Sequence, residues 1–179
     1  MGEFPAIGER PWIDVGGEVT RVLSGVDPDQ LNRLRAKLES PRGKCFFTGM
    51  GRAGFVAQMG AMRLMQLGRV AHVVGEATAP AFSGEDTLVV ISGSGGTPTS
   101  VLRAQRAHDL GGAVCCLTAT PGSPIALLSD PCVIVPSSGS IQFAQVLFSQ
   151  VALLALDGIA LAISGGDTSI MRRNHANLE

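Results

Sequence analysis

Five short apolar runs recur along the chain, and glycine loops or helical patterns separate them. The runs occupy residues 45–48, 70–74, 88–91, 113–117 and 132–135. Runs of this length between turn residues are typical of buried parallel strands, which need long crossover connections. The pattern predicts an α/β fold: a doubly wound, five-stranded parallel sheet flanked by helices, as in flavodoxin-like or Rossmann-like three-layer sandwiches.

Three residue pairs mark the starts of helices. A capping residue precedes proline, which is favoured in the first helical position, at Asp27-Pro28, Thr97-Pro98 and Ser123-Pro124. After the first pair, leucines recur at helical spacing. We expect an N-terminal segment at residues 1–26 and a single domain at residues 27–179, which includes a C-terminal helix and tail.

Charge and composition exclude several classes of protein. The chain has 14 Lys and Arg against 15 Asp and Glu, a formal net charge of −1, and 45% hydrophobic residues. It therefore has the apolar mass for a core and lacks the basic surface that binds nucleic acid. Low charge combined with so many apolar residues also predicts that part of the surface is buried in a homo-oligomer.

The cysteines and the N-terminal residues are typical of a cytoplasmic protein. Four cysteines lie inside apolar runs, with no Cys-x-x-Cys pair and no adjacent histidine: Cys45, Cys115, Cys116 and Cys132. We therefore expect buried, reduced thiols and no metal site. Residues 1–12 lack the basic, apolar and small-residue order of a signal peptide.

The most apolar stretch, residues 146–163, is as long as a membrane span but contains Gln150 and Asp157. A carboxylate near the middle of a span costs about 2.5–3.5 kcal/mol on insertion scales. We therefore expect no membrane partner. The interpretation is a helix buried between subunits, with Asp157 paired across the subunit interface.

The first glycine loop follows the first apolar run. It reads Gly49-Met50-Gly51-Arg52-Ala53-Gly54 and opens a helix, so it matches the local form of the dinucleotide fingerprint. In that interpretation Glu76, at the end of the next strand, would bind a ribose hydroxyl. Taken alone, the motif indicates a nicotinamide or flavin cofactor.

The second glycine loop, residues 92–97, favours a different ligand. Ser92, Ser94 and Thr97 supply hydroxyls, and the glycines let backbone amides approach a ligand at a helix N-terminus. Such donors suit the oxygens of a phosphate monoester. The alternative is a plain turn in which Thr97 only caps the helix. No Walker motif supports a nucleotide triphosphate.

Four stretches resemble the SIS (sugar isomerase) domain family, which binds phosphosugars. They are residues 49–54, 61–65, 73–80 and 91–97, and the terminal residues 173–179 are also similar. The resemblance extends from about Asp27 onward. It implies that Ser92, Ser94 and Thr97 hold the phosphate and that the first loop, with Gly49, Gly51 and Arg52, borders the sugar. It leaves the dinucleotide site as a minor alternative and implies no cofactor.

Within that family the stretches are most similar to the 6-phospho-3-hexuloisomerases. The resemblance implies a reaction that converts a hexulose 6-phosphate to fructose 6-phosphate, in formaldehyde fixation through ribulose monophosphate. The carbonyl moves from carbon 3 to carbon 2 through an enediolate, and a general base moves the proton. The resemblance also implies a tetramer in which the C-terminal segment meets a neighbouring subunit's site.

The chain departs from its relatives at the expected base. They usually read Phe-Glu-Gln where this chain reads Phe148-Ser149-Gln150, and residues 137–144 lack the usual Pro-Met-Gly turn. Loss of a general base commonly slows a reaction by about 10² to 10⁴. The alternative to an isomerase is therefore a non-catalytic module that binds sugar phosphates.

Other side chains are candidates for the missing role. His175 suits proton transfer near neutral pH, with a surface or interface contact as its alternative. Glu76 would contact sugar hydroxyls or lie in a solvated turn. Arg52 would neutralise phosphate or enediolate charge, or form a surface ion pair. We expect His72 and His108 to be structural.

Overall fold

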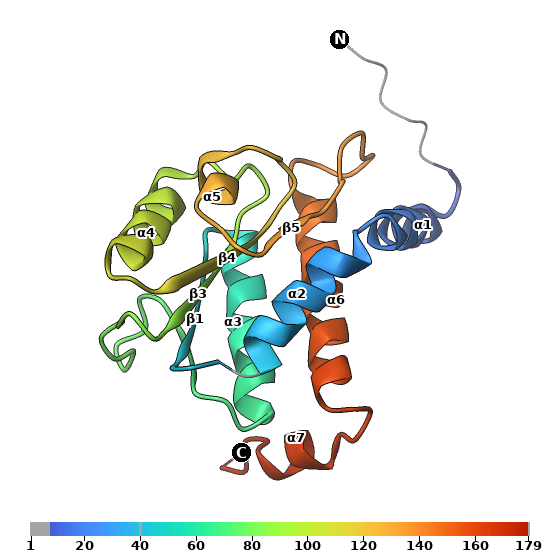
Figure 1. The fold of residues 1–179 in the computed structure, drawn as a ribbon. Coiled ribbons are helices and arrows are strands. Elements are labelled where there is room, and N and C mark those ends of the chain that lie inside the picture. The colour runs from blue at the N-terminus through green and yellow to red at the C-terminus, as the bar shows by residue number, and fades with distance from the viewer. Residues whose placement is uncertain (1–7, 40, 179) are drawn as a thin grey trace.

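The computed structural model describes residues 8–39 and 41–178. Part of the predicted N-terminal segment, residues 1–7, lies outside the described residues. So does residue 179, the last residue of the terminal stretch. Figure 1 shows the chain as α1 (Pro11–Ser24), α2 (Pro28–Glu39), β1 (Cys45–Gly49), α3 (Arg52–Gln66), β2 (Ala71–Val73), β3 (Thr87–Ile91), α4 (Pro98–Asp109), β4 (Ala113–Thr118), α5 (Pro124–Leu127), β5 (Cys132–Ile134), α6 (Val146–Ile163) and α7 (Ser169–Arg173).

The strands form one parallel sheet in the order β2-β1-β3-β4-β5. The prediction of a five-stranded parallel sheet is confirmed. The chain leaves β1 toward one edge and continues from β3 toward the other, so the strand order reverses between β1 and β3. In that pair Gly49 lies opposite Ile91. Both glycine loops therefore leave the sheet side by side at the topological switch point, where open α/β sheets bind ligands.

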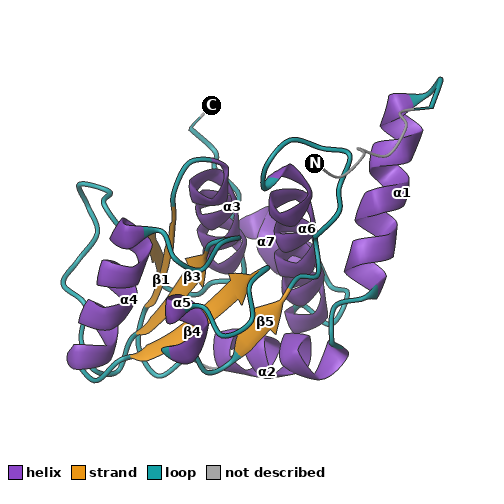
Figure 2. Cartoon of the chain, turned by 90° about the horizontal axis from the view of Figure 1, so that it is seen from above, coloured by secondary structure: helices purple, strands orange, loops and turns teal. Residues whose placement is uncertain are grey.

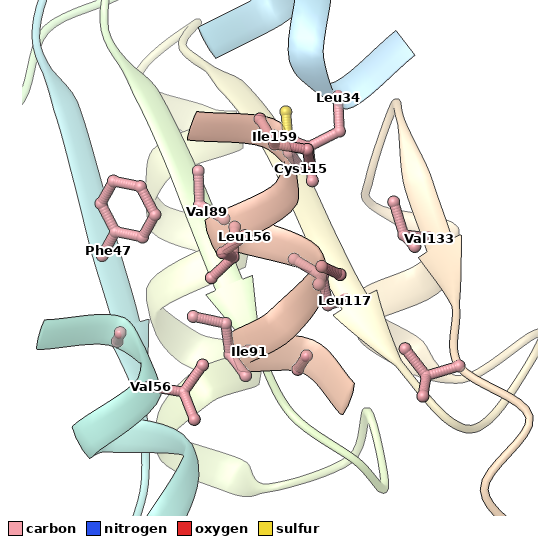
Figure 3. Packing of buried hydrophobic residues seen from close by; sticks show 14 of the residues in the cluster. Leu34, Phe47, Val56, Val89, Ile91, Cys115, Leu117, Val133, Leu156 and Ile159 are labelled. Atoms are coloured by element: carbon pink, nitrogen blue, oxygen red, sulfur yellow. The ribbon is translucent and has the colours of Figure 1, made fainter. Parts of the chain in front are cut away.

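Helices cover both faces of the sheet (Figure 2). Side chains alternate between the faces along each strand because the backbone is extended. On β3, Val89 and Ile91 face α3 and α6, whereas Leu88 and Val90 pack on the side of α4 and α5. Figure 3 shows the larger cluster, in which α6 lies across the sheet residues.

The two edge strands are less buried than predicted. All three residues of β2 are half-buried, as are Cys132 and Ile134 of β5. The prediction that every strand is buried is therefore wrong at the edges, where each strand has one neighbour instead of two. Cys132 is accordingly half-buried, whereas the other three cysteines are buried; all four are free thiols.

The helix α1 has no counterpart among the predicted elements. It packs on α6, and its Val22 is 1% exposed within the main hydrophobic cluster. Val26, in the turn before α2, joins the same cluster. The boundary between residues 26 and 27 stays a prediction, but α1 shares the core of the rest of the chain.

The apolar stretch at residues 146–163 forms α6, and half of it is buried inside the chain. Among the residues described, α6 alone is long and apolar enough to cross a membrane. Its inner side packs on α1, α2 and α3, as in the core helix of a folded domain. Leu154 and Leu161 are exposed, and their burial between subunits stays a prediction.

Asp157 has a partner in its own chain. Its Oδ1 accepts a hydrogen bond from Arg63 Nε of α3 at 2.7 Å. The prediction that Asp157 pairs across a subunit interface is therefore wrong. Because α3 and α6 pack side by side, the two side chains meet without a second subunit.

Candidate active site

The two glycine loops and the start of α6 enclose one cavity of about 200 Å³. It gathers five of the residues that the sequence singled out, Arg52, Ser92, Ser94, Thr97 and Ser149. The other lining residues are Met50, Ala53, Ile91, Gly93, Ala144, Gln145 and Phe148. The cavity thus lies at the switch point between β1 and β3.

The first loop turns tightly enough to require glycine. A β-carbon on Gly49 would overlap the carbonyl oxygen of Ala53. Gly51 has a φ of +57°, a conformation that glycine adopts without strain. The turn brings Arg52, the first residue of α3, to the rim of the cavity. In the part of the chain that the structure describes, Arg52 has no carboxylate partner, so the predicted alternative of a surface ion pair does not occur there.

The second loop is held in place through Gly93. The carbonyl oxygen of Gly93 accepts hydrogen bonds from Ala119 N at 3.0 Å, Thr120 Oγ1 at 3.2 Å and Thr118 Oγ1 at 3.3 Å. Gly95 has a φ of +59°, and a β-carbon there would overlap Ser123 Oγ. These contacts fix the loop against the segment that follows β4, so its donors are arranged before a ligand binds.

Thr97 is the N-cap residue of α4, but its hydroxyl does not cap the helix. Its side chain makes no hydrogen bond to the helix backbone, and its Oγ1 lies 3.5 Å from Ser94 Oγ. The predicted N-cap position of Thr97 is therefore confirmed, whereas the alternative in which its hydroxyl only caps the helix is wrong. Its hydroxyl instead lies beside that of Ser94 in the wall of the cavity, next to the unpaired backbone N–H groups that begin every helix.

Ser149 lies at the cavity, and its hydroxyl is already bonded. It is 7% exposed, and its Oγ donates to the carbonyl oxygen of Gln145 at 2.9 Å. This is the local bond that serine commonly makes to the preceding turn of its helix. The Gln145 side chain lies against Gly93, where a β-carbon would be 2.8 Å from Gln145 Cδ.

The structure keeps His175 away from this cavity of the same chain. His175 follows α7, which packs at the C-terminal end of α3, and Asn174 Nδ2 donates to the carbonyl oxygen of Gln66 at 3.0 Å. Arg52 begins α3, and a 15-residue helix is about 22 Å long. Figure 1 shows α7 beside the end of α3 that is opposite to its start.

Glu76 also lies outside the cavity. It follows β2 and accepts a hydrogen bond from Val73 N at 3.4 Å, and it lines a different cavity on the α4 face of the sheet. Both the dinucleotide hypothesis and the sugar-contact hypothesis require Glu76 to lie beside the first glycine loop. The structure does not bring them together.

The remaining histidines have the structural positions that we expected. His72 lies on β2 with its ring centroid 5.4 Å from that of Phe46. His108 is exposed on α4, and its Nδ1 lies 3.9 Å from Asp109 Oδ1. Neither residue lines the cavity.

The charge at the cavity is positive. Among its lining residues Arg52 is the one ionisable side chain. A cavity with one guanidinium, clustered hydroxyls and the N-termini of α3, α4 and α6 favours a small anion. In the described ranges of this chain, no carboxylate and no imidazole lines the cavity. No group of three or more His, Cys, Asp or Glu suited to a metal occurs in those ranges either.

Glu18 is a contributor that the sequence did not indicate. From α1 it accepts hydrogen bonds from Ile141 N and Ser140 Oγ at 2.9 Å and from Gln142 Nε2 at 3.1 Å. Partial burial opposes the charged carboxylate, but these bonds prevail and lower the pKa of Glu18 below its ordinary value. Glu18 thereby fixes the loop that leads into Gln145 at the rim of the cavity.

The comparison with protein families identifies the fold. The model of the SIS domain matches residues 37–172, a range that contains both glycine loops and α6. The chain belongs to the SIS domain family. The resemblance seen in the glycine loops is thus confirmed, and so is the α/β fold with its five-stranded parallel sheet.

Individual relatives align with this chain over most of their length. The chain is 36% identical to the 3-hexulose-6-phosphate isomerase of Mycobacterium gastri, over 92% of this chain and 88% of that protein. It is 38% identical to the protein of the same name from Bacillus subtilis, over 75% and 79%. A crystal structure of a Methanococcus jannaschii protein, described as inferring a function of 3-hexulose-6-phosphate isomerase, is 26% identical with a TM-score of 0.81, over 94% and 98%.

Proposed function

We propose that this chain is a sugar-phosphate isomerase that interconverts a hex-3-ulose 6-phosphate and fructose 6-phosphate. One observation carries the proposal: the pairing of Gly49 with Ile91 brings both glycine loops to a single cavity with Arg52 and clustered hydroxyls. The names of the curated relatives support the same reaction.

The phosphate is assigned to the second loop. A phosphate monoester presents three oxygens and about two negative charges, and Ser92, Ser94 and Thr97 offer three hydroxyl donors around the N-terminus of α4. Charge-assisted hydrogen bonds of this kind are short and strong. The bound phosphate would anchor the sugar and hold carbons 2 and 3 in place for the reaction.

The reaction requires a proton to move between neighbouring carbons. A base removes the proton from one carbon, an enediolate forms, and a proton returns to the other carbon. Arg52 at the rim carries the positive charge that stabilises the enediolate oxygen. No step of this reaction transfers electrons to a cofactor.

The base is assigned to a second subunit. Ser149 Oγ donates to a backbone carbonyl, and no described residue activates it as a base. His175 of a neighbouring subunit is the candidate, because imidazole is the side chain most often used for general acid–base catalysis. This assignment requires a homo-oligomer, which we propose to be a tetramer.

An apolar stripe on α3 supports association between copies. Four large side chains at helical spacing are exposed, namely Phe55, Met59, Met62 and Met65. Soluble monomers rarely leave such contiguous apolar surface in water. Packing against another copy would bury it.

The direct test is turnover of hex-3-ulose 6-phosphate by purified protein, with fructose 6-phosphate measured as the product. We expect turnover, and a loss of about 10² to 10⁴ in kcat in His175→Ala if imidazole is the base. His108→Ala, which changes an exposed histidine remote from the cavity, is the matched control. A protein that binds the sugar phosphate tightly without turnover would instead be the non-catalytic module.

A further inference from the structure

A second cavity lies on the opposite face of the sheet, below the segment that joins β2 to β3. Its volume is about 320 Å³, within the range of small-molecule sites. None of its lining residues lines the first cavity. They comprise an apolar floor and three charged side chains, in full Phe46, Val74, Gly75, Glu76, Ala79, Pro80, Phe82, Leu88, Arg103, Arg106, Ala107 and Leu110.

The floor of this cavity is aromatic and firmly packed. Phe46 of β1 is 3% exposed, and its ring centroid lies 5.3 Å from that of Phe82. Phe82 in turn packs over Gly112, where a β-carbon would overlap its ring. Because both rings are held by the sheet and its turns, they offer a preformed apolar surface to a flat or aliphatic ligand.

The rim of the same cavity is basic. Arg103 and Arg106 are three residues apart on α4 and therefore project from one side of that helix. Arg103 Nη1 donates to Thr48 Oγ1 at 2.7 Å. Within the described residues neither guanidinium lies within 4.0 Å of a carboxylate. Glu76 adds one negative charge to the rim, which leaves a formal charge of +1.

We propose that this second cavity is a binding site for a small amphipathic organic anion. The apolar body of the ligand packs on Phe46 and Phe82, and its carboxylate, sulfonate or phosphate faces Arg103 and Arg106. Two features carry the assignment: the apolar floor excludes a bare inorganic ion as the best ligand, and the unpaired guanidinium groups select negative charge. The site is separate from the sugar-phosphate cavity and independent of the isomerase reaction.

A pair of fluorescent probes tests the proposal. 8-Anilinonaphthalene-1-sulfonate and N-phenyl-1-naphthylamine share their rings, but only the first carries a charge. We expect saturable binding of the sulfonate, at least about tenfold tighter than the neutral probe, a ratio that corresponds to about 1.4 kcal/mol. Arg106→Ala should abolish this preference, whereas Arg10→Ala, at an exposed arginine on α1's N-terminal side, should leave it intact.

Two further measurements locate the probe. Phe82→Ala should weaken the binding of both probes. If circular dichroism shows that Phe82→Ala is unfolded, Leu110→Ala at the rim replaces it in this test. Saturating fructose 6-phosphate should not displace the sulfonate. The proposal is overturned if wild-type protein shows no preference for the charged probe or if that preference survives Arg106→Ala. Displacement of the sulfonate by fructose 6-phosphate would also overturn it. None of these results bears on whether the chain turns over a hexulose phosphate.

Discussion

At the scale of single residues, two positions at the cavity's loops require glycine, and one position differs from the residue that relatives usually have. Gly49 and Gly95 stand where a β-carbon would overlap neighbouring atoms, so their identity follows from backbone geometry alone. Ser149 is the departure, because it places a bonded hydroxyl where the resemblance to SIS relatives implies a carboxylate. Substitutions at position 149 therefore test whether that position still faces the substrate.

Ser149→Glu should raise turnover of hex-3-ulose 6-phosphate. A carboxylate at this position would lie in the cavity beside Arg52, and we expect kcat to rise about 10- to 100-fold, because general bases contribute about 10² to 10⁴. Ser149→Gln matches the size without the charge and should show no gain. Equal kcat for wild type and both variants would show that position 149 does not reach the reacting carbons.

Gly49→Ala should destabilise the fold, because the added methyl group would overlap the backbone oxygen of Ala53. We expect the free energy of unfolding to fall by about 1–3 kcal/mol, as for overpacked sites. Gly16→Ala is the control, since a β-carbon on Gly16 in α1 meets nothing within 4 Å and should add about 0.5–1 kcal/mol. Urea unfolding measures both, and an unchanged stability in Gly49→Ala would contradict the close approach of Gly49 to Ala53.

At the scale of elements, α1 acts on the cavity through the loop before α6. Glu18 holds that loop with three hydrogen bonds, and the positive charge of Arg21 also favours its carboxylate. The loop continues into Ala144, which has a φ of +51°, and then into Gln145. The position of Gln145 at the cavity therefore depends on a helix that lies outside the range matched by the SIS domain family.

Glu18→Gln should lower the free energy of unfolding by about 1–3 kcal/mol near neutral pH, because hydrogen bonds to a charged acceptor are lost. The native pKa of Glu18 is below its ordinary value, so this stabilisation is present above the ordinary pKa of about 4.3 and is lost as the pH falls through the lowered value. Glu9→Gln, at an exposed carboxylate, is the control. An identical pH dependence of stability in wild type and Glu18→Gln would exclude the role of this carboxylate.

Local patterns predicted the elements better than the contacts between them. The strands and both glycine loops are encoded within a few residues, so short apolar runs and glycine spacing were enough. Asp157 and Glu18 bond to residues 94 and 122 or more positions away, and no local pattern encodes such partners. Glu76 was misplaced because the chain after β2 lies on the α4 side of the sheet, where Phe82 packs on Gly112, and no local spacing encodes that contact.

At the scale of the whole molecule, the described residues of one chain line the proposed phosphate site with no carboxylate or imidazole. The cavity is at one end of α3 and His175 lies at the other, so the proposed reaction needs two copies. If two copies form each site, variants that lack different parts of the site should complement each other and restore turnover. The exposed stripe on α3 gives a surface over which copies can associate.

A mixed oligomer of His175→Ala chains and Ser92→Ala/Ser94→Ala chains should regain turnover that neither variant has alone. Some sites in the mixture would combine an intact phosphate loop with an intact His175 of the neighbouring subunit. Activity after co-refolding, compared with each variant refolded by itself, measures the effect. Absence of any recovery, with mixed oligomers confirmed by mass spectrometry, would show that sites are not shared between subunits.

The most direct test of the phosphate cavity is calorimetric titration of fructose 6-phosphate into wild type and Ser92→Ala/Ser94→Ala. Each lost hydrogen bond to a charged group is worth about 1.5–3 kcal/mol, so we predict that the double variant binds at least about tenfold more weakly. Ser24→Ala, at an exposed serine of α1, should bind as wild type does. Equal affinities for wild type and the double variant would contradict the assignment of this cavity to the phosphate.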